Sequence, residues 1–325
     1  MFRTEDGRGG NLFARAVGVA DASMAHDVII IGTGPAGLAA GAYAGRSGLD
    51  TLFFEDESIG GELVNRHEIR SYPGFPDGVS GTELRSKMVE EAEKYDPDVN
   101  LERVQRIEPG DPHAVLTESG AYEATAVIVA TGSSDGHLGV PGEEEYAGRG
   151  VFYCATCDGP LYREERIAVV GGGNHAVIDA VFLTEYASEV LLIDGESELA
   201  ADETLVEEAR EHDDVEILNG ATVAEVLGAD GLVTGVRVER GGGEETIELG
   251  GVNVNVGSRP NSSFLDDTVA LDDEGHVAVD HRMETDVAGV FAAGDVRQGS
   301  PLEIAAAVGD GVTAIEAAKR HVAER

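Results

Sequence analysis

Two glycine-rich loops occur in the same sequence surroundings in different parts of the chain. The first loop runs from Gly32 to Gly37 (GTGPAG). It follows the apolar residues 28–31 and precedes a run of small residues at 38–46 and a second apolar run at 51–54. Apolar runs of this length are typical of buried parallel strands, and Glu55 stands directly after the second one. The order strand, glycine turn, helix, strand and acid predicts a βαβ unit that binds a dinucleotide.

The same plan is repeated at residues 166–196. A strand at 167–170 leads into the loop from Gly171 to Ala176 (GGGNHA), a helix that extends to Tyr186, and a strand at 190–193 that ends at Asp194. One such loop is weak evidence of nucleotide binding. Two loops in full βαβ context, each followed by an acid at the right distance, predict two dinucleotide-binding units in one chain.

The rest of the pattern places these units in two domains. Further strands are expected within 125–133, 251–261 and 289–296, antiparallel ribbons at 223–239 and 246–249, and a closing helix at 302–320. The turn-rich segments 134–142 and 257–263 are expected to be hinges. We therefore expect an α/β fold of two Rossmann-like three-layer domains, the second (139–260) inserted into the first (25–138 and 261–325). Residues 1–24 are expected to be a disordered leader, with Met24 as the natural start.

The charge of the chain excludes several classes of partner. Asp and Glu number 62 against 23 Lys and Arg, which gives a formal net charge of −39 over 325 residues. A surface this acidic repels nucleic acid and anionic lipid, and it is stable where salt screens its self-repulsion. This composition predicts a halophilic source, such as a haloarchaeon. No apolar stretch of membrane-spanning length and no secretory signal is found, so a cytoplasmic location is expected.

The two loops differ in the nucleotide that they favour. At the first, Gly32, Gly34 and Gly37 let the backbone approach a pyrophosphate, and Glu55 would accept the ribose hydroxyls of an adenosine. At the second, with Gly171, Gly173 and Ala176, the acid is Asp194. A carboxylate there favours a ribose 2′-hydroxyl and repels a 2′-phosphate, and no Arg or Lys occurs between Arg166 and Arg210. The second loop therefore predicts NADH, or no nicotinamide, rather than NADPH.

The only two cysteines, Cys154 and Cys157, stand in the sequence CATCDG. A zinc site needs about four ligands, and neither a second cysteine pair nor a histidine at ligand spacing is present, so no metal is expected. Two inert core cysteines would also be possible. The spacing C-x-x-C allows a disulfide, and Asp158 next to it could move the proton that thiol–disulfide exchange requires. A redox pair is the favoured interpretation.

The motifs of this chain resemble those of a known family. The motifs GTGPAG, GGELVNRHEIRSYPGFP, ATG, CATCDG, GGGNHA and GVFAAGD, in this order from about Met24 onward, are similar to those of the low-molecular-weight thioredoxin reductases. These are flavoproteins with two dinucleotide-binding domains and are typically homodimers. CATCDG between the two glycine loops is the most specific of the motifs.

The resemblance implies roles for individual residues. The first domain would bind FAD, with Glu55 at the adenosine ribose and Asp295 at the ribityl chain. Cys157 would accept electrons from the flavin, Cys154 would attack the disulfide of thioredoxin or a thioredoxin-like protein, and Asp158 would act as acid and base. A rotation of the second domain would carry the pair between flavin and substrate. The remaining FAD contacts implied are Gly32, Gly34, Pro35, Ala36, Gly37, Gly61, Glu62, Thr131, Gly132 and Gly294.

Three departures from the family pattern concern the electron donor. The basic NADPH motif after the second strand of the second unit is absent, and Asp194 stands there. Glu62 replaces a usual Gln, and Leu302-Glu303 replaces a usual Arg-Gln pair. The donor could therefore be NADH, with NADPH less favoured, or a ferredoxin-type protein. Alternative functions are an FAD-dependent dithiol oxidase that uses oxygen and, least favoured, a flavin redox sensor without turnover.

Overall fold

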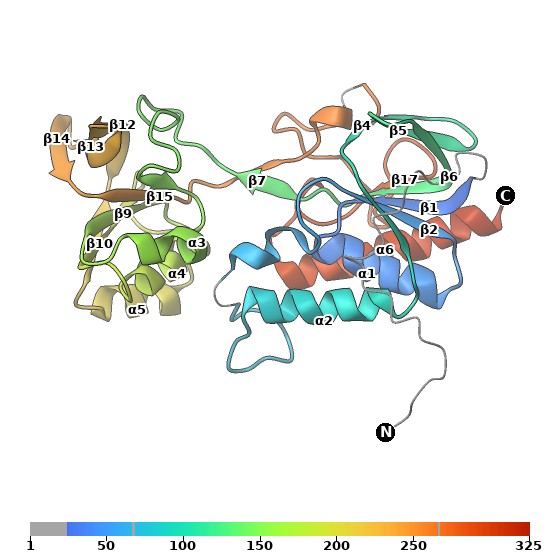
Figure 1. The fold of residues 1–325 in the computed structure, drawn as a ribbon, viewed down its shortest axis with the longest axis horizontal. Helices are drawn as coiled ribbons and strands as arrows, with labels where there is room; N and C mark the ends of the chain where they lie inside the picture. The colour runs from blue at the N-terminus through green and yellow to red at the C-terminus, as the bar shows by residue number, and fades with distance from the viewer. Residues whose placement is uncertain (1–24, 67–68, 266) are drawn as a thin grey trace. The chain divides into compact units, whose positions relative to one another are not determined.

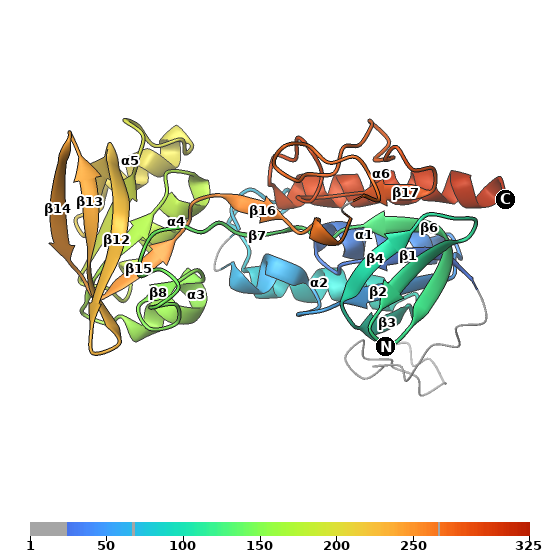
Figure 2. The ribbon, with the colours of Figure 1, turned by 90° about the horizontal axis from the view of Figure 1, so that it is seen from above.

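The computed structural model describes residues 25–66, 69–265 and 267–325 (Figures 1 and 2). The expected leader and Met24 lie outside these residues. The chain divides into two compact units, one containing the chain up to Ser133 together with Pro260–Arg325, the other Ser134–Arg259. The expected domain boundaries were 138/139 and 260/261. The two crossing segments, β7 (Ser133–Asp135) and β16 (Ser258–Pro260), pair with each other as a two-stranded sheet.

The first unit is built on a seven-stranded sheet of order β3-β2-β1-β6-β5-β4, with β17 also pairing with β6. Strands β1, β2, β3, β6 and β17 are parallel neighbours, whereas β4 and β5 extend the sheet in antiparallel fashion. Neighbouring parallel strands end at one edge, so the segments that follow them meet there. The strands are β1 (His26–Ile31), β2 (Thr51–Glu55), β3 (Asp98–Leu101), β4 (Val104–Glu108), β5 (His113–Thr117), β6 (Ala121–Val129) and β17 (Val290–Ala292).

Three helices cover one face of this sheet, as Figure 1 shows. They are α1 (Pro35–Arg46), α2 (Gly81–Glu93) and α6 (Ile304–Ala323); two 3₁₀ turns, η2 (Gly61–Asn65) and η4 (Ser263–Leu265), complete the unit. Side chains such as Phe53 pack against the helices, while alternate residues such as Phe54 pack on the other face. The strands are therefore apolar on both faces, as expected for a sheet between two layers.

Local sequence explains where these helices begin. Helix α1 starts at Pro35, three residues before the expected start at 38, because proline is well suited to the first helical position. Helix α2 is capped by Ser80, whose Oγ accepts the N–H of Glu83 at 3.2 Å. Helix α6 starts at Ile304 rather than at 302, because Leu302 has a φ of 57°, which is outside the helical region.

The second unit has a five-stranded parallel sheet of order β11-β10-β9-β15-β8. In Figure 1 its helices lie on one side of this sheet and a three-stranded antiparallel sheet, β12-β13-β14, lies on the other. Helix α4 ends at Leu183, three residues before the expected end at 186. The elements are β8 (Val151–Phe152), α3 (Ala155–Asp158), η3 (Gly159–Leu161), β9 (Arg166–Val170), α4 (Asn174–Leu183), β10 (Glu189–Asp194), α5 (Glu203–Glu211), β11 (Val215–Asn219), β12 (Ala221–Ala229), β13 (Leu232–Arg240), β14 (Gly243–Glu248) and β15 (Gly251–Val254).

Among the residues that the structure describes, no helix is long and apolar enough to cross a membrane.

Candidate active site

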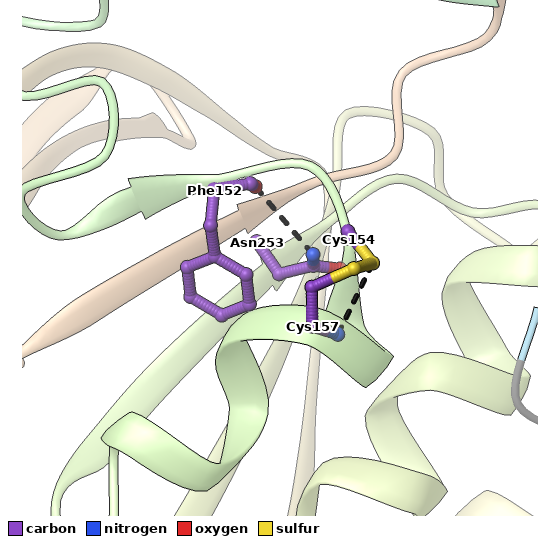
Figure 3. Close-up of a disulfide and its surroundings, with 4 residues drawn as sticks. All are labelled: Phe152, Cys154, Cys157 and Asn253. Atoms are coloured by element: carbon purple, nitrogen blue, oxygen red, sulfur yellow. Dashed lines mark hydrogen bonds between the residues drawn. A yellow bond between two sulfur atoms is a disulfide. The ribbon is translucent and has the colours of Figure 1, made fainter. Parts of the chain in front are cut away.

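The two cysteines form a disulfide at the start of helix α3 (Figure 3). Their Cα atoms are 5.3 Å apart, a separation that one helical turn provides between residues three apart. Cys154 is the residue that caps the helix, and its Sγ accepts the backbone N–H of Cys157 at 3.1 Å. Cys154 is half-buried and Cys157 is exposed. The pair thus lies at a partly exposed position, and the sulfur of Cys154 already receives a hydrogen bond.

Asp158 is the last residue of α3, directly after the pair. Partial burial raises the pKa of this carboxyl above its ordinary value. Burial, and then the charge of Asp158, raise the pKa of the Tyr162 hydroxyl to about 12. The Tyr162 ring stacks on Phe152 with centroids 4.7 Å apart, which fixes the segment around the pair. A carboxyl with a raised pKa beside a redox disulfide is suited to give and take a proton nearer neutral pH.

A second carboxylate near the pair was not singled out from the sequence. Glu143 is 2% exposed and accepts the N–H groups of Leu138 at 3.0 Å and Gly139 at 2.7 Å, and the hydroxyl of Tyr153 at 2.9 Å. Burial opposes ionisation, but these hydrogen bonds outweigh it and hold the pKa of Glu143 below its ordinary value. Because Tyr153 precedes Cys154, this buried carboxylate anchors the chain that enters the disulfide. No sequence pattern marks it, since the contact depends on a loop closing on itself.

The first glycine loop connects β1 to α1 and has glycine where the backbone is crowded. Gly32 has a φ of 101°, and an added Cβ would lie 2.3 Å from the carbonyl oxygen of Ala130. An added Cβ on Gly37 would lie 2.0 Å from the carbonyl oxygen of Gly32, whereas one on Gly34 would meet nothing within 4 Å. The loop is therefore packed at both ends and open in the middle, where a pyrophosphate would approach. Pro35 and Ala36 form the first turn of α1.

Glu55, at the end of β2, is held by this loop. It is 8% exposed, and one carboxylate oxygen accepts both the backbone N–H of Thr33 at 2.9 Å and its hydroxyl at 2.6 Å. The other oxygen accepts the N–H groups of Asp56 and Glu57. The Thr33 hydroxyl also accepts the N–H of Gly60 at 3.2 Å, which joins the loop to the turn before η2. Thr33 was not singled out from the sequence, because the second loop position has no fixed residue type.

The other residues implied for FAD contact lie around the same loop. An added Cβ on Gly61 would lie 3.2 Å from Cα of Gly34, and one on Gly294 would lie 3.1 Å from Cβ of Ala36. Gly61 and Glu62 are the first residues of η2, Thr131 and Gly132 follow β6, and Gly294 and Asp295 follow β17. The structure thus brings all of these residues to the edge of the sheet where the parallel strands end.

Two carboxyl groups, Asp295 after β17 and Asp310 on α6, have different roles. Burial raises the pKa of Asp295, whose carboxylate accepts the Ser300 hydroxyl at 3.0 Å. Asp310 on α6 forms a buried ion pair with Arg297, with Nε–Oδ2 at 2.7 Å and Nη2–Oδ1 at 3.1 Å. Asp310 also accepts the N–H of Gly294, so the pair fixes the turn that presents Asp295.

These residues fit FAD. The open face at Gly34 is where the pyrophosphate needs room. The Thr33 hydroxyl donates to a carboxylate oxygen of Glu55, and that oxygen can accept a second hydrogen bond from a ribose hydroxyl. On the neighbouring strand β3, Nδ2 of Asn100 is buried without a hydrogen-bond partner among the described residues. Because β3 pairs with β2 one residue before Glu55, this buried donor lies at the adenosine end of the expected site. Bound FAD would supply the hydride transfer that no side chain of the chain can perform.

The second glycine loop connects β9 to α4. Gly171 has a φ of 141°, and an added Cβ would lie 2.1 Å from the carbonyl oxygen of Asn255. Gly173 faces open space, and Ala176 is buried in the helix. Asp194, at the end of β10, is half-buried, and burial raises its pKa while the N–H groups of Glu196 and Gly195 oppose that rise. Its carboxylate lies over Gly172, where an added Cβ would come within 2.3 Å of Oδ2.

No group of three or more His, Cys, Asp or Glu side chains within the described residues is arranged to hold a metal ion.

Comparison with known proteins identifies the family. The family model for pyridine nucleotide-disulphide oxidoreductases matches residues 26–311. The thioredoxin reductase of Mycolicibacterium smegmatis is 41% identical over 304 residues, which cover 92% of this chain and 97% of that protein. The crystal structure of Lactococcus lactis thioredoxin reductase in the FR conformation superposes with a TM-score of 0.90 at 36% identity, covering 92% of this chain and 100% of that one. A ferredoxin-flavin thioredoxin reductase of Clostridium acetobutylicum matches with a TM-score of 0.51 at 31% identity, covering 92% and 99%.

These matches confirm the predicted fold class of two Rossmann-like α/β domains. They also confirm the expected class of enzyme, an FAD-dependent disulfide oxidoreductase. The chain belongs to the thioredoxin reductase family of the pyridine nucleotide-disulphide oxidoreductases.

Proposed function

We propose that this enzyme reduces the disulfide of thioredoxin or a thioredoxin-like protein, with electrons that reach the Cys154–Cys157 pair from FAD. The observation that carries the proposal is the disulfide itself, formed within one helical turn, partly exposed and followed by a carboxyl with a raised pKa. The relatives that match over nearly their whole length are thioredoxin reductases, and this supports the choice of substrate.

Cys154 is the proposed nucleophile toward the partner. Its sulfur accepts the N–H of Cys157, and a hydrogen bond of this kind favours a thiolate over a thiol. The Cys154 thiolate attacks one sulfur of the partner disulfide, which breaks that bond and forms a mixed disulfide. The Cys157 thiol then loses its proton and attacks Cys154. The partner leaves as a dithiol, two electrons richer, and the Cys154–Cys157 disulfide forms again.

Asp158 is the proposed acid and base of this exchange. The partner needs two protons to leave as a dithiol, and the Cys157 thiol must lose one before it attacks. Because its pKa lies above that of an ordinary aspartate, Asp158 can hold such a proton closer to neutral pH. Thr156, between the two cysteines, has no role in this scheme and provides a matched control position.

The test is single turnover with the purified flavoprotein. The enzyme is reduced anaerobically with dithionite and mixed with oxidised thioredoxin, and the thiols of thioredoxin are counted. Cys157→Ser and Cys154→Ser are each expected to abolish thioredoxin reduction, whereas Thr156→Ser leaves it intact. Undiminished reduction by either cysteine variant would show that the pair does not carry the electrons. Oxygen uptake with a small dithiol, without thioredoxin reduction, would favour the dithiol oxidase instead.

For the FAD site we propose contacts from four groups of residues. The pyrophosphate would lie against the loop formed by Gly32, Gly34, Pro35, Ala36 and Gly37, and the adenosine ribose at Glu55. Asp295 would bind the ribityl chain. Gly61, Glu62, Thr131, Gly132 and Gly294 would line the remainder. Their common position at one edge of one sheet supports this assignment.

For the electron donor we propose NADH rather than NADPH, bound at Gly171, Gly173, Ala176 and Asp194. Asp194 is half-buried, and the sequence has no cationic side chain between Arg166 and Arg210 that could neutralise a 2′-phosphate. The alternative donor is a ferredoxin-type protein, and it is favoured by the resemblance to the Clostridium acetobutylicum enzyme. Anaerobic mixing with each nucleotide separates these options. Loss of the visible flavin absorbance with NADH alone supports the proposal, and loss with neither nucleotide favours a protein donor.

We also propose that the enzyme works as a homodimer in the high-salt cytoplasm of a halophilic organism. The net charge of −39, with 62 acids distributed along the chain, supports the salt requirement. Thermal unfolding as a function of KCl tests it: the midpoint is expected to rise as salt screens the acidic surface, and full stability in dilute buffer contradicts it. Light scattering in molar KCl tests the dimer.

A further inference from the structure

The carboxylate of Glu143 joins two segments of the second unit that lie apart in the sequence. On one side it accepts the backbone N–H groups of Leu138 and Gly139, in the loop that follows β7. On the other it accepts the hydroxyl of Tyr153, the residue directly before Cys154. Glu143 is 2% exposed, and a charge this deeply buried is stable only where hydrogen bonds replace water. The hydrogen bond between Glu143 and Tyr153 is therefore costly to break.

The turn that carries Glu143 is itself fixed on strand β12. The carbonyl oxygen of Pro141 accepts the N–H of Val226 at 2.9 Å. Gly142 has a φ of 86°, and an added Cβ would lie 2.0 Å from the carbonyl oxygen of Val226. Because the backbone of this turn lies directly against β12, Glu143 holds a fixed position and does not simply follow its partners.

The side chain of Tyr153 is held from two sides. Its hydroxyl donates to Glu143 at 2.9 Å, so Nδ1 of His137, which lies 2.9 Å from the same hydroxyl oxygen, donates the second hydrogen bond. Burial, and then the hydrogen bond to Glu143, raise the pKa of the Tyr153 hydroxyl, which therefore keeps its proton and remains a donor. The backbone of this fixed residue continues directly into Cys154.

The position of Tyr153 matters most when the disulfide is open. Cys154 caps α3 with an extended backbone (φ −114°, ψ 99°), and in this conformation its Sγ accepts the N–H of Cys157 at 3.1 Å. In the oxidised pair the S–S bond also ties the two residues together. Reduction removes that bond, and the conformation of Cys154 then depends on the chain that precedes it.

We propose that Glu143 and Tyr153 are positioning residues that keep Cys154 in its capping conformation after the pair is reduced. This inference rests on the proposed redox function of the pair. Reduction breaks the S–S bond and adds two electrons, which the flavin of this family provides, and two protons to give two thiols, or one proton where Cys154 remains a thiolate. A Cys154 thiolate accepts a charge-assisted hydrogen bond from the Cys157 N–H only while Cys154 stays at the cap. A fixed Tyr153 therefore favours the thiolate, which is the nucleophile.

The test measures the pKa of the Cys154 thiol in the reduced holoenzyme. The enzyme is reduced anaerobically with dithionite, desalted, and alkylated with iodoacetamide at a series of pH values, and fragment mass spectra assign the label to each cysteine. Tyr153→Phe removes the hydroxyl and keeps the ring. It is expected to raise the pKa of the Cys154 thiol by about half a unit, so that its alkylation below that pKa is about threefold slower.

Glu143→Gln separates an effect of position from an effect of charge. Loss of a negative charge would by itself lower the pKa of a thiol, because an anion disfavours a thiolate. The new NH₂ group cannot accept the hydrogen bonds that the carboxylate oxygen accepted, so the hold on Tyr153 is weakened. The proposal therefore expects the pKa of Cys154 to rise, as in Tyr153→Phe. A fall would overturn it, because Glu143 would then act through its charge.

Tyr146→Phe provides the matched control, because it removes the hydroxyl of another buried tyrosine of the same unit. The Tyr146 ring lies over β12, where an added Cβ on Gly228 would come within 2.4 Å of its Cζ. This variant is expected to leave the pKa of Cys154 unchanged.

Two further outcomes are decisive. An unchanged Cys154 pKa in Tyr153→Phe, beside a wild-type enzyme whose Cys154 titrates, overturns this inference and leaves Glu143 a structural residue, even where thermal stability falls. If Glu143→Gln does not fold, Tyr153→Phe decides alone. A wild-type pair that dithionite cannot open would instead overturn the proposed function, and this inference with it.

Discussion

The two glycine loops follow one plan but treat the acid after the second strand in opposite ways. In the first unit the second loop position is Thr33, whose N–H and hydroxyl both donate to Glu55, so this carboxylate is buried and braced by its own loop. In the second unit the corresponding position is Gly172, and Asp194 lies over it; within the described residues its hydrogen bonds come from the N–H groups of Gly195 and Glu196. Glu55 is therefore held by the fold, whereas Asp194 remains half-buried and can accept hydrogen bonds from a ligand.

This difference matches the two ligands proposed, FAD at the first loop and NADH at the second. A site whose polar groups are already fixed loses little entropy when its ligand binds, which suits a cofactor that stays in place. A less braced carboxylate at Asp194 suits a nucleotide that enters and leaves in each catalytic cycle. The comparison therefore predicts that equal changes in the two loops have unequal effects, larger on folding and FAD retention in the first loop and larger on nucleotide exchange in the second.

The largest difference is expected at the third glycine position. Gly37→Ala places a Cβ 2.0 Å from the carbonyl oxygen of Gly32, a contact that forces the backbone to move. A loss of about 3 kcal/mol of unfolding free energy and loss of FAD are expected. The second loop already has Ala176 at this position, and Ala176→Gly is expected to lower stability by only about 1 kcal/mol. Urea unfolding and the flavin content of the purified proteins measure both effects, and equal losses would contradict the comparison.

The next largest difference is expected at the two acids. Glu55→Gln replaces one accepting oxygen by an NH₂ group that faces backbone N–H donors, so a loss of about 2 kcal/mol is expected together with weaker FAD binding. Asp194→Asn changes a half-buried group that water can reach and whose ionisation is already disfavoured by burial, so a change of at most about 1 kcal/mol is expected. Thermal unfolding in the presence and absence of added FAD measures the two variants side by side. A larger loss in Asp194→Asn would show that its carboxylate is also braced.

The parts of the site that could be predicted from sequence are those carried by short, fixed spacings. The glycine loops, their acids and the cysteine pair each lie within one local segment, where neighbouring residues determine the geometry. Small errors arose where a backbone preference acts on one residue: Pro35 starts α1 early, and Leu302, with its positive φ, delays the start of α6.

The parts that could not be predicted depend on long-range pairing. Asn253 comes close to the cysteines only because β15 pairs with β8, about a hundred residues earlier in the chain, a register that no local pattern specifies. Glu143 likewise becomes a buried anchor only when its loop closes over Tyr153. The alternation of valine and asparagine in β15 was a visible signal, since buried polar residues in a parallel strand need a reason, but it does not name the partner.

The nucleotide preference offers a sharper test of the second loop. Asp194→Ser removes the charge that repels a 2′-phosphate, and Glu196→Arg adds a cation two residues further on. The double variant is expected to raise the ratio of kcat/KM for NADPH to that for NADH by about tenfold or more. Glu248→Arg, which adds the same charge on the exposed edge strand β14, is the control and is expected to leave the ratio unchanged. If flavin reduction is slow with both nucleotides in all variants, the donor is not a nicotinamide.

The smallest expected effect is the pH dependence of NADH binding. Burial raises the pKa of Asp194 above its ordinary value, so this carboxyl begins to take up a proton at a higher pH than an exposed aspartate. Only the ionised form accepts both ribose hydroxyls. The affinity for NADH is therefore expected to be constant well above the raised pKa and to fall as the pH drops through it, by up to about tenfold for each pH unit below. For folding the sign is opposite, because a raised pKa contributes stability that is present at acid pH and lost as the pH rises through it.

Fluorescence titration of NADH binding across this range measures the effect of pH on affinity. Asp194→Asn, which cannot titrate, is expected to give a flat profile, and a wild-type profile that is equally flat would show that the carboxylate of Asp194 does not contact the ribose.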